Sequence, residues 1–219
     1  KYDLLIPVTD TGCQICMKYR GVIEEKVKIA LPSNEVMEFS QNKELLLKTC
    51  AKLGIPFPKY NTISSIEEIK DLQNRVEYPL YLKPINSAKI IKDRVKHFEV
   101  KKVNSFHELE EFCLKYVQDV PIMVQRVCKG KGVGIYILAS HGEIISATQQ
   151  KRIHEPPDGG GGSYRITTEI NPSLMRYTEK LVKETQWHGV AMIEFKGSEK
   201  TNEWEIMEIN GRFWGSLSL

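Results

Sequence analysis

The spacing of hydrophobic residues changes along the chain between the period of a strand and that of a helix. Extended apolar runs predict strands over residues 2–8 and 27–31. A helix is predicted to begin at about Asn42, because leucines and a cysteine then recur on one helical face. Gly54 ends this helix, and the two prolines that follow prevent its continuation.

Two serine–glutamate pairs have the spacing of helix capping boxes. One pair predicts a helix from Ser65 through Val76, and the other predicts a helix from Ser105 through Val117. The second helix carries its aromatic residues at helical spacing. We therefore assign these rings to the core rather than to a platform that stacks on bases.

The remaining extended runs predict strands that are joined mainly by hairpins. One further helix is predicted from the N-cap and first-turn pair Asn171-Pro172 to about Gln186. The predicted strands cover residues 80–83, 97–103, 122–127, 133–139, 143–150, 190–195 and 203–209. Hairpins that alternate with single helices indicate an α+β fold with antiparallel sheets, not a doubly wound parallel fold.

The composition adds limits on function. Of 219 residues, 41% are hydrophobic and 27% are charged, and 31 basic against 28 acidic residues give a net charge of +3. This mild balance argues against nucleic acid and against an anionic membrane as partners. No stretch approaches the ~20 apolar residues that span a bilayer. The chain begins inside a strand pattern without Met or a signal-peptide layout, so we expect a fragment of a longer protein.

Five cysteines are present, an odd number, and three of them lie in apolar patterns. We therefore expect reduced thiols and a cytoplasmic location. The pair Cys13-Gln-Ile-Cys16 leaves a redox protein, or half a zinc site, as a remote alternative.

The last two predicted strands carry carboxylates inside apolar runs. Because side chains on a strand alternate with period 2, Glu208 and Asn210 are predicted to share a face with Trp204 and Ile206. If these two strands are neighbours, Glu194 meets Glu208 on one side of the sheet. Burying a carboxylate without a partner costs several kcal/mol, so a partner is expected.

Two carboxylates and an amide oxygen on rigid strands suit Mg²⁺, which takes a few protein oxygens and completes its shell with phosphate and water. Arg212 lies two residues past Asn210, where it can stabilise charge on a transferring phosphoryl group. The alternative is that these carboxylates face solvent, as is expected of Glu199, Glu203 and Glu205. From the residues alone, both interpretations stay open.

The residues around the two carboxylates also resemble a known enzyme family. The segment Met207-Glu208-Ile209-Asn210-Gly211-Arg212, with Glu194-Phe195 before it, resembles the closing motif of ATP-grasp enzymes, whose usual form is Glu-Ile-Asn-Pro-Arg. Residues 187–192 and 213–216 are similar to a carbamoyl-phosphate-synthase-like subgroup, and the match runs from about Asn42 to the end. The resemblance implies the ATP-grasp fold, two α+β subdomains with antiparallel sheets, preceded by the remnant of an α/β N-terminal domain.

The same resemblance implies a division of the chain. Residues 1–40 would be the C-terminal part of a pre-ATP-grasp α/β domain, and residues 41–219 the ATP-grasp domain. Within the latter, about 62–124 would form the small nucleotide-binding subdomain. The metal-binding subdomain would cover 125–219 and stop before its closing helix.

The family pattern also implies nucleotide contacts. Lys43 and Lys83 match lysines that contact the phosphates of ATP. The hinge strand, whose backbone contacts the edge of the adenine base, is matched by Gln125, Arg126 and Val127.

A glycine-rich loop follows in the family pattern, and it closes over the phosphates or the acceptor. It is matched by the stretch from Arg152 to Ser163, in which Gly160, Gly161, Gly162 and Ser163 are candidate phosphate-binding residues.

The family's metal ligands and catalytic residues also have counterparts. The arginine near the acyl phosphate is matched by Arg212, which with Lys83 and Arg152 makes up the candidate catalytic set. The implied ligands of two Mg²⁺ ions, replaceable by Mn²⁺, are Glu194, Glu208 and Asn210.

Three positions depart from the family pattern. The hairpin after the second lysine, residues 85–90, has no glycine, and Arg126 and Lys131 stand where the hinge has a glutamate. Gly211 replaces the common proline of the closing motif.

The implied reaction is the ATP-dependent activation of a small-molecule carboxylate as an acyl phosphate, which an amine or similar nucleophile then attacks. A non-catalytic or regulatory MgATP-binding module on the same fold is the main alternative. A homodimer is left open.

Overall fold

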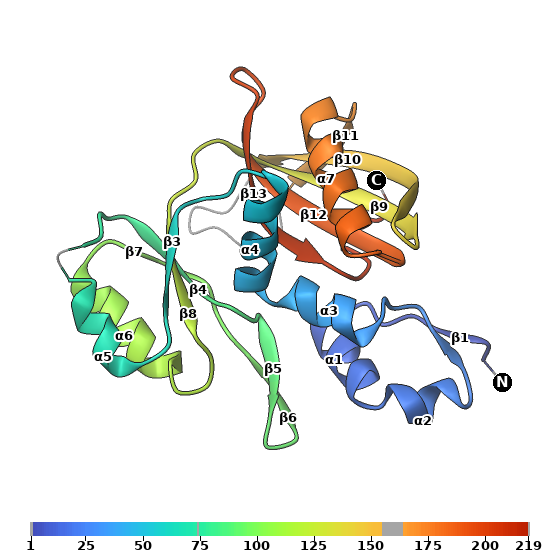
Figure 1. The fold of residues 1–219 in the computed structure, drawn as a ribbon, viewed down its shortest axis with the longest axis horizontal. Helices are drawn as coiled ribbons and strands as arrows, with labels where there is room; N and C mark the ends of the chain where they lie inside the picture. The colour runs from blue at the N-terminus through green and yellow to red at the C-terminus, as the bar shows by residue number, and fades with distance from the viewer. Residues whose placement is uncertain (1, 74, 155–163, 219) are drawn as a thin grey trace.

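A computed structural model of the chain describes residues 2–73, 75–154 and 164–218. Figure 1 shows three parts: an N-terminal unit, a four-stranded sheet with two helices, and a five-stranded sheet with one helix. Helix α4 (Lys43–Leu53) lies between the parts and contacts α3, α7 and β13. None of the helices in the described ranges is long and apolar enough to cross a membrane.

The N-terminal unit is a small parallel α/β arrangement. Strand β1 pairs with β2 in parallel, and the two helices between them cover a buried cluster that includes Cys13, Cys16 and Met37. Its elements are β1 (Leu4–Leu5), α1 (Asp10–Lys18), α2 (Arg20–Glu24), β2 (Lys28–Ile29) and α3 (Asn34–Gln41). Both strands are shorter than the apolar runs predicted, and α3 was not predicted.

Helix α4 begins and ends as its sequence predicts. The Asn42 side chain accepts a hydrogen bond from the Leu45 backbone at 3.0 Å, and Gly54 ends the helix with a φ of +65°. A left-handed residue at this position is cheap only for glycine. The face with Leu46 and Leu47 is buried in a hydrophobic cluster that runs through both sheets.

The four-stranded sheet has the order β3-β8-β4-β7, with antiparallel neighbours. Helices α5 and α6 cover one face of it (Figure 1). A separate hairpin, β5–β6, follows β4. The elements are β3 (Tyr60–Ile63), α5 (Ile66–Asp71), β4 (Leu80–Pro84), β5 (Ala88–Ile91), β6 (Arg94–His97), β7 (Lys101–Val103), α6 (Phe106–Tyr116) and β8 (Ile122–Arg126).

Two predictions in this part are wrong. The helix that begins after Ser65 ends at Asp71 rather than Val76, because within α5 only Ile69 is buried and little packing supports a longer helix. The strand predicted over 97–103 is divided between β6 and β7, because Phe98 turns into the core between them. By contrast, α6 and its aromatic core face are confirmed.

The five-stranded sheet has the order β11-β10-β9-β12-β13, and all neighbours are antiparallel. Helix α7 packs on β9 and β10, and it begins where predicted, with Asn171 as its N-cap and Pro172 in its first turn. The sequence did not predict β11. The elements are β9 (Lys131–Ser140), β10 (Glu143–His154), β11 (Tyr164–Thr168), α7 (Pro172–Glu184), β12 (Gly189–Ser198) and β13 (Glu203–Asn210).

A bulge in β13 decides which residues face the core. Glu194 is paired with Glu208, but the next residue, Phe195, is paired with Ile206, so Met207 is the extra residue. Trp204 and Ile206 therefore point into the core, and Glu208 and Asn210 point to the opposite face. The predicted single face for all four is wrong, because a one-residue insertion inverts the alternation.

Candidate functional site

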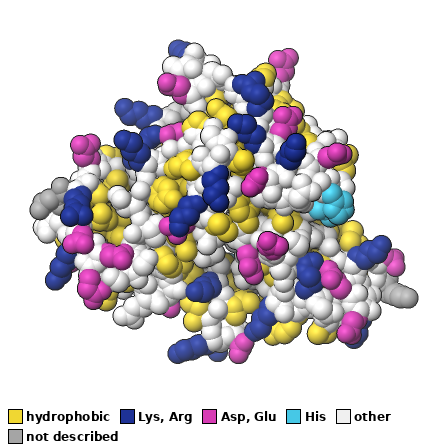
Figure 2. Space-filling view, viewed as in Figure 1, with side chains coloured by type: hydrophobic (Ala, Val, Ile, Leu, Met, Phe, Trp, Pro, Cys, Tyr) yellow, Lys and Arg dark blue, Asp and Glu magenta, His cyan; other side chains and the backbone are white. Residues whose placement is uncertain are grey.

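A cleft of about 370 Å³ lies between the two sheets, on the face of β12 and β13 that carries the carboxylates. This volume falls within the range of small-molecule sites. The cleft is lined by Tyr81, Lys83, Val100, Gln125, Cys128, Arg152, Arg165, Met192, Glu194, Lys196, Met207, Glu208, Asn210 and Arg212. Elsewhere, basic and acidic side chains are interspersed, as Figure 2 shows for one face of the molecule.

Two carboxylates form one wall of the cleft. Glu194 and Glu208 are cross-strand partners, and the Asn210 amide donates to Glu208 at 3.1 Å. Burial raises the pKa of Glu194, and the charge of Glu208 raises it further. The meeting of Glu194 and Glu208 that the sequence predicted is therefore found.

Two arginines balance this charge. Arg152 donates to both oxygens of Glu194, at 2.6 and 2.5 Å, and Arg165 donates to one of them at 3.3 Å. Arg165 also donates to the hydroxyl of Tyr136, whose ring packs against Trp214 with centroids 4.5 Å apart. Arg165 was not predicted as a site residue, because its strand was not recognised.

Lys83 enters the cleft from β4, where it lies two residues from Tyr81. Burial lowers the pKa of Lys83 to about 8, and the charge of Lys43 lowers it too, whereas Glu208 and Glu194 act in the opposite direction. A cation with this low pKa, next to two carboxylates, is the kind of group that a bound anion would stabilise.

The end of β8 lies beside the cleft. The Gln125 side chain is buried and lines the cleft. The Arg126 side chain points elsewhere and pairs with Glu205, and the thiol of Cys128 donates to the same carboxylate at 2.9 Å. Val127 lines a separate groove behind the connection to β9. The three predicted hinge residues are thus adjacent, but only the Gln125 side chain enters the cleft.

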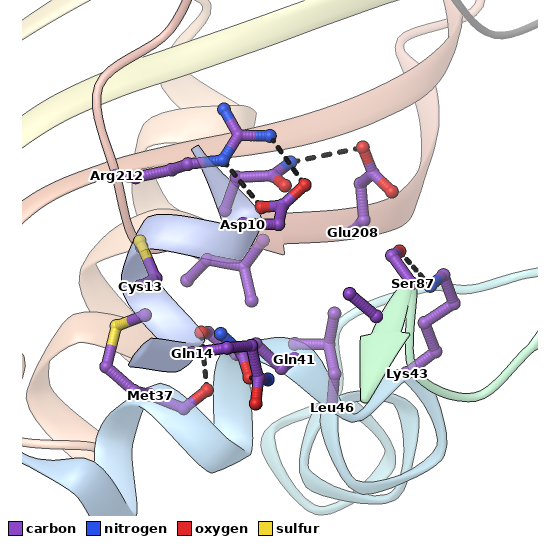
Figure 3. Close-up of a pocket in the computed structure, with 15 residues that line it drawn as sticks. Asp10, Cys13, Gln14, Met37, Gln41, Lys43, Leu46, Ser87, Glu208 and Arg212 are labelled. Atoms are coloured by element: carbon purple, nitrogen blue, oxygen red, sulfur yellow. Dashed lines mark hydrogen bonds and ion pairs between the residues drawn. The ribbon is translucent and has the colours of Figure 1, made fainter. Parts of the chain in front are cut away.

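Lys43 faces a second, smaller cavity rather than the cleft. Its ammonium donates to Ser87 at 2.8 Å, and burial lowers the pKa of Lys43. Figure 3 shows Arg212 and Asp10 on one side of this cavity and Lys43 with Ser87 on the other. Glu208, Asn210 and Arg212 line both spaces, so the two adjoin at the end of β13.

Arg212 is held by a residue from the N-terminal unit. Asp10, in the first turn of α1, accepts from the Arg212 guanidinium at 2.6 and 3.2 Å. Burial disfavours the charged guanidinium, but Asp10 outweighs this effect and raises the pKa of Arg212. A separation of 202 residues left no local signal from which the pair could be predicted.

The Cys13–Cys16 pair does not have the properties of a redox site. Both thiols are free and buried in α1, and burial raises the pKa of Cys13 to about 11. Reactive cysteines of redox motifs have lowered pKa values instead.

The donor set fits Mg²⁺ bound together with phosphate. Within the described ranges, no group of three or more His, Cys, Asp or Glu side chains comes together. Glu194, Glu208 and the Asn210 amide oxygen are therefore too few to enclose an ion alone. Mg²⁺ is ordinarily held by one or two carboxylates plus substrate phosphates, and this set matches that pattern. The predicted phosphate-binding residues Gly160, Gly161, Gly162 and Ser163 lie outside the described residues.

Several solved structures share this arrangement. D-alanine–D-alanine ligase from Bacillus anthracis, complexed with ATP, has a TM-score of 0.68 and 16% identity over 96% of this chain and 68% of that one. N5-carboxyaminoimidazole synthase from Aspergillus clavatus, in complex with ADP and 5-aminoimidazole ribonucleotide, has a TM-score of 0.66 and 19% identity over 91% and 52%.

The chain has the ATP-grasp fold. The resemblance stated from the closing motif is thereby confirmed at the level of the fold, and the cleft lies between the two ATP-grasp sheets.

Sequence comparison agrees with the ATP-grasp assignment. The carbamoyl phosphate synthase large chain of a Thermoanaerobacter species is 25% identical over 203 residues, which are 88% of this chain and 18% of that protein. The chain thus spans less than a fifth of the length of this relative. No family model matches the chain.

Proposed function

We propose that this chain is part of an ATP-dependent ligase that activates a carboxylate as an acyl phosphate for attack by an amine or a similar nucleophile. The observation that carries the proposal is the opposed pair Glu194 and Glu208, set in a cleft between two ATP-grasp sheets with Lys83 at its other wall. Opposed carboxylates beside a buried lysine suit a metal-bound polyphosphate.

The nucleotide would lie along the cleft. We assign its base to the end bounded by Gln125 and the backbone of Arg126 and Val127, and its phosphates to Lys83. Glu194, Glu208 and Asn210 would hold Mg²⁺, which neutralises phosphate charge when it is bound. Lys43 lines the second cavity and not the cleft, so we assign it to that cavity, next to Glu208.

The second cavity adjoins the end of the cleft to which we assign the phosphates. Arg212 lines both spaces and is positioned to stabilise charge on the group in transfer. In the proposed reaction, a carboxylate oxygen of the substrate bonds to the γ-phosphorus and ADP leaves. The amine then bonds to the acyl carbon and phosphate leaves.

The proposed division of the chain follows the same arrangement. Residues 1–40 supply Asp10 from a pre-ATP-grasp unit, and residues 41–219 form the ATP-grasp part. Within it, residues 62–124 carry Lys83, and residues 125–219 carry the carboxylates. Five free, buried cysteines support a reducing, cytoplasmic setting for this proposal.

A screen of small carboxylates and amines for ATP-dependent phosphate release tests the proposal. Wild-type protein should form ADP with one combination. Loss of a residue that hydrogen-bonds to a metal ligand lowers metal affinity or activity about 10- to 100-fold. Glu208→Gln alters a ligand itself, so it should lower the rate of ADP formation by more than this. Glu203→Gln, an exposed carboxylate on the same strand, is the matched control and should behave as wild type. Equal turnover by Glu208→Gln would overturn the assignment.

One observation favours a second candidate, a non-catalytic MgATP-binding module. The glycine-free hairpin β5–β6 is bound to α1, through Lys18 with Asp93 at 2.6 Å and Thr11 with His97 at 2.9 Å. None of residues 88–97, all of which are described, lines the cleft. Binding of MgATP without phosphate release under every substrate combination would support this candidate over the ligase.

A further inference from the structure

Two arginines stand opposite each other on β10 and β11 and share one carboxylate. Arg152 and Arg165 are cross-strand partners in the antiparallel register, and both contact Glu194. Like charges placed directly opposite on a sheet are destabilising. An anion beside the pair offsets this repulsion, and the Glu194 carboxylate does so here.

The three side chains are shielded from water. The side chains of Glu194, Arg165 and Arg152 are 12%, 13% and 17% exposed. At this level of burial, a charge needs a partner. Arg165 is also fixed by its hydrogen bond to the Tyr136 hydroxyl, so its position does not depend on Glu194 alone.

The Glu194 carboxylate has two competing uses. It neutralises the two arginines in this structure, and under the proposed function it is a ligand of Mg²⁺ together with Glu208. A carboxylate that moves onto a metal ion no longer balances two guanidinium groups. Metal binding would then remove the Glu194 charge from the arginine pair at the wall of the cleft, and an anion that binds the pair would restore it.

We propose that Arg152 and Arg165 form a phosphate-binding site, and that Glu194 occupies this site until Mg²⁺ and nucleotide bind. This inference rests on the proposed function, which supplies the ligand class. The ligand is the terminal phosphate of MgATP or the same group after transfer. Two guanidinium groups suit such a ligand, because each presents a planar set of donors to phosphate oxygens. Glu194 thus exchanges the arginines for the metal ion.

The exchange predicts an inverted effect for Glu194→Gln. In EDTA, ATP must compete with the Glu194 carboxylate for the arginines, so the neutral glutamine should tighten Mg-free ATP about 10-fold in a calorimetric titration. In MgCl₂ the same variant should bind ATP more weakly than wild type. A purely structural ion pair predicts loss or no change under both conditions, and that result would overturn the proposal.

Removing the negative charge of Glu194 also reduces the general electrostatic repulsion of ATP. A double variant separates this effect from the release of the arginine pair. If the arginine pair is the site, the gain from Glu194→Gln in EDTA should disappear in the Arg165→Met background. Persistence of the full gain there would overturn the proposal.

Single replacement of Arg165 tests which phosphate is bound. Arg165→Met should weaken a non-hydrolysable MgATP analogue about 10- to 100-fold, and MgADP much less. Arg165→Lys keeps the charge and should fall between. Arg176→Met removes an arginine from α7, outside the cleft lining, and is the matched control. If Arg165→Met weakens only the binding of inorganic phosphate to the MgADP complex, the arginine pair binds the phosphoryl group after its transfer. Equal losses for MgATP and MgADP, or no loss for MgATP, MgADP or inorganic phosphate, would overturn the proposal.

The arginine site and the ligase activity can be tested apart from each other. If wild type forms ADP with an acceptor but Arg165→Met binds every ligand as wild type does, only the arginine site fails. If Arg165→Met shows the selective loss but no acceptor supports ADP formation, only the ligase fails. Thermal unfolding of each ligand-free variant shows whether a binding loss reflects the fold, and Arg165→Lys, which keeps the buried charge, guards against that outcome.

Discussion

Glu194 and Glu208 are directly opposed across β12 and β13, and the bulge at Met207 immediately adjoins their pairing. The bulge lets Trp204, Ile206 and Ile209 all reach the core while Glu208 faces the cleft beside Glu194. Two opposed carboxylates repel, and the raised pKa of Glu194 reflects burial and this repulsion. Such a pair is stable only when cations are beside it, and the arginines and Lys83 surround it.

Lys83 gives a pH dependence to nucleotide binding. Because its pKa is lowered to about 8, the ammonium is charged below that pH and neutral above it. MgATP affinity should therefore decline as pH rises through about 8, and Lys83→Arg, whose guanidinium stays charged, should remove the decline. Calorimetric titrations at a series of pH values measure this. An affinity that stays level until about pH 10, where an ordinary lysine titrates, would contradict it.

The same shift predicts an effect on stability. A lysine that is less basic in the folded state makes an unfavourable contribution below about pH 8, and this penalty is relieved as pH rises from there to the unfolded pKa near 10.4. Urea unfolding of wild type and Lys83→Met across this range should show the difference between the two proteins shrinking with pH. A constant difference would argue against the lowered pKa.

Asp10 positions Arg212 from another part of the fold. Asp10→Asn should lower the free energy of unfolding by about 1 kcal/mol, because the pair is bidentate but partly exposed to solvent. MgATP affinity should change little, because Asp10 lines the second cavity and is not among the residues of the cleft. Lys18→Gln breaks a more exposed ion pair and is the control. If Asp10→Asn weakens MgATP as strongly as Glu208→Gln, the separation of the two spaces is wrong.

Gly211 stands where a side chain would be crowded. A Cβ at this position would lie 2.8 Å from the sulfur of Met37 and 3.2 Å from the ring of Trp187. Gly211→Ala should therefore destabilise the protein by about 1–3 kcal/mol in urea unfolding. Gly215→Ala is the control, because a Cβ there meets nothing within 4 Å. Equal stability of the two variants would show that Met37 and the ring yield without cost.

Buried thiols should react slowly. At pH 8 the raised pKa of Cys13, about 11, leaves almost no thiolate, so a thiol reagent should label this residue only as the protein unfolds. Counting labelled thiols with and without denaturant measures this, and five should react after unfolding. Rapid native labelling of Cys13, or a disulfide with Cys16, would revive the redox alternative.

Local signals carried most of the sequence prediction. The cap at Asn42, the left-handed glycine at position 54 and the Asn171-Pro172 pair each set a helix end by short-range chemistry, and all were found. Period 2 placed Glu194 beside Glu208 but failed for Trp204 and Ile206, because nothing in the local pattern marks the bulge.

The missed features depend on contacts between distant segments. Asp10 reaches Arg212 across 202 residues, and Arg165 lies on a strand that its own sequence does not mark. The separation of Lys43 from the cleft depends in the same way on how α4 packs against β13. Such pairings follow from the tertiary arrangement and leave no signature in a window of a few residues.

The most direct test of the central claim is a calorimetric titration of MgATP into wild type, Glu208→Gln and Glu203→Gln. The carboxylate pair is assigned to hold the metal-bound nucleotide, so wild type and Glu203→Gln should bind one MgATP per chain with equal affinity. Glu208→Gln should bind at least about 10-fold more weakly, because one charged ligand of the ion is lost. Equal binding by all three proteins, or no binding by wild type, would contradict the account.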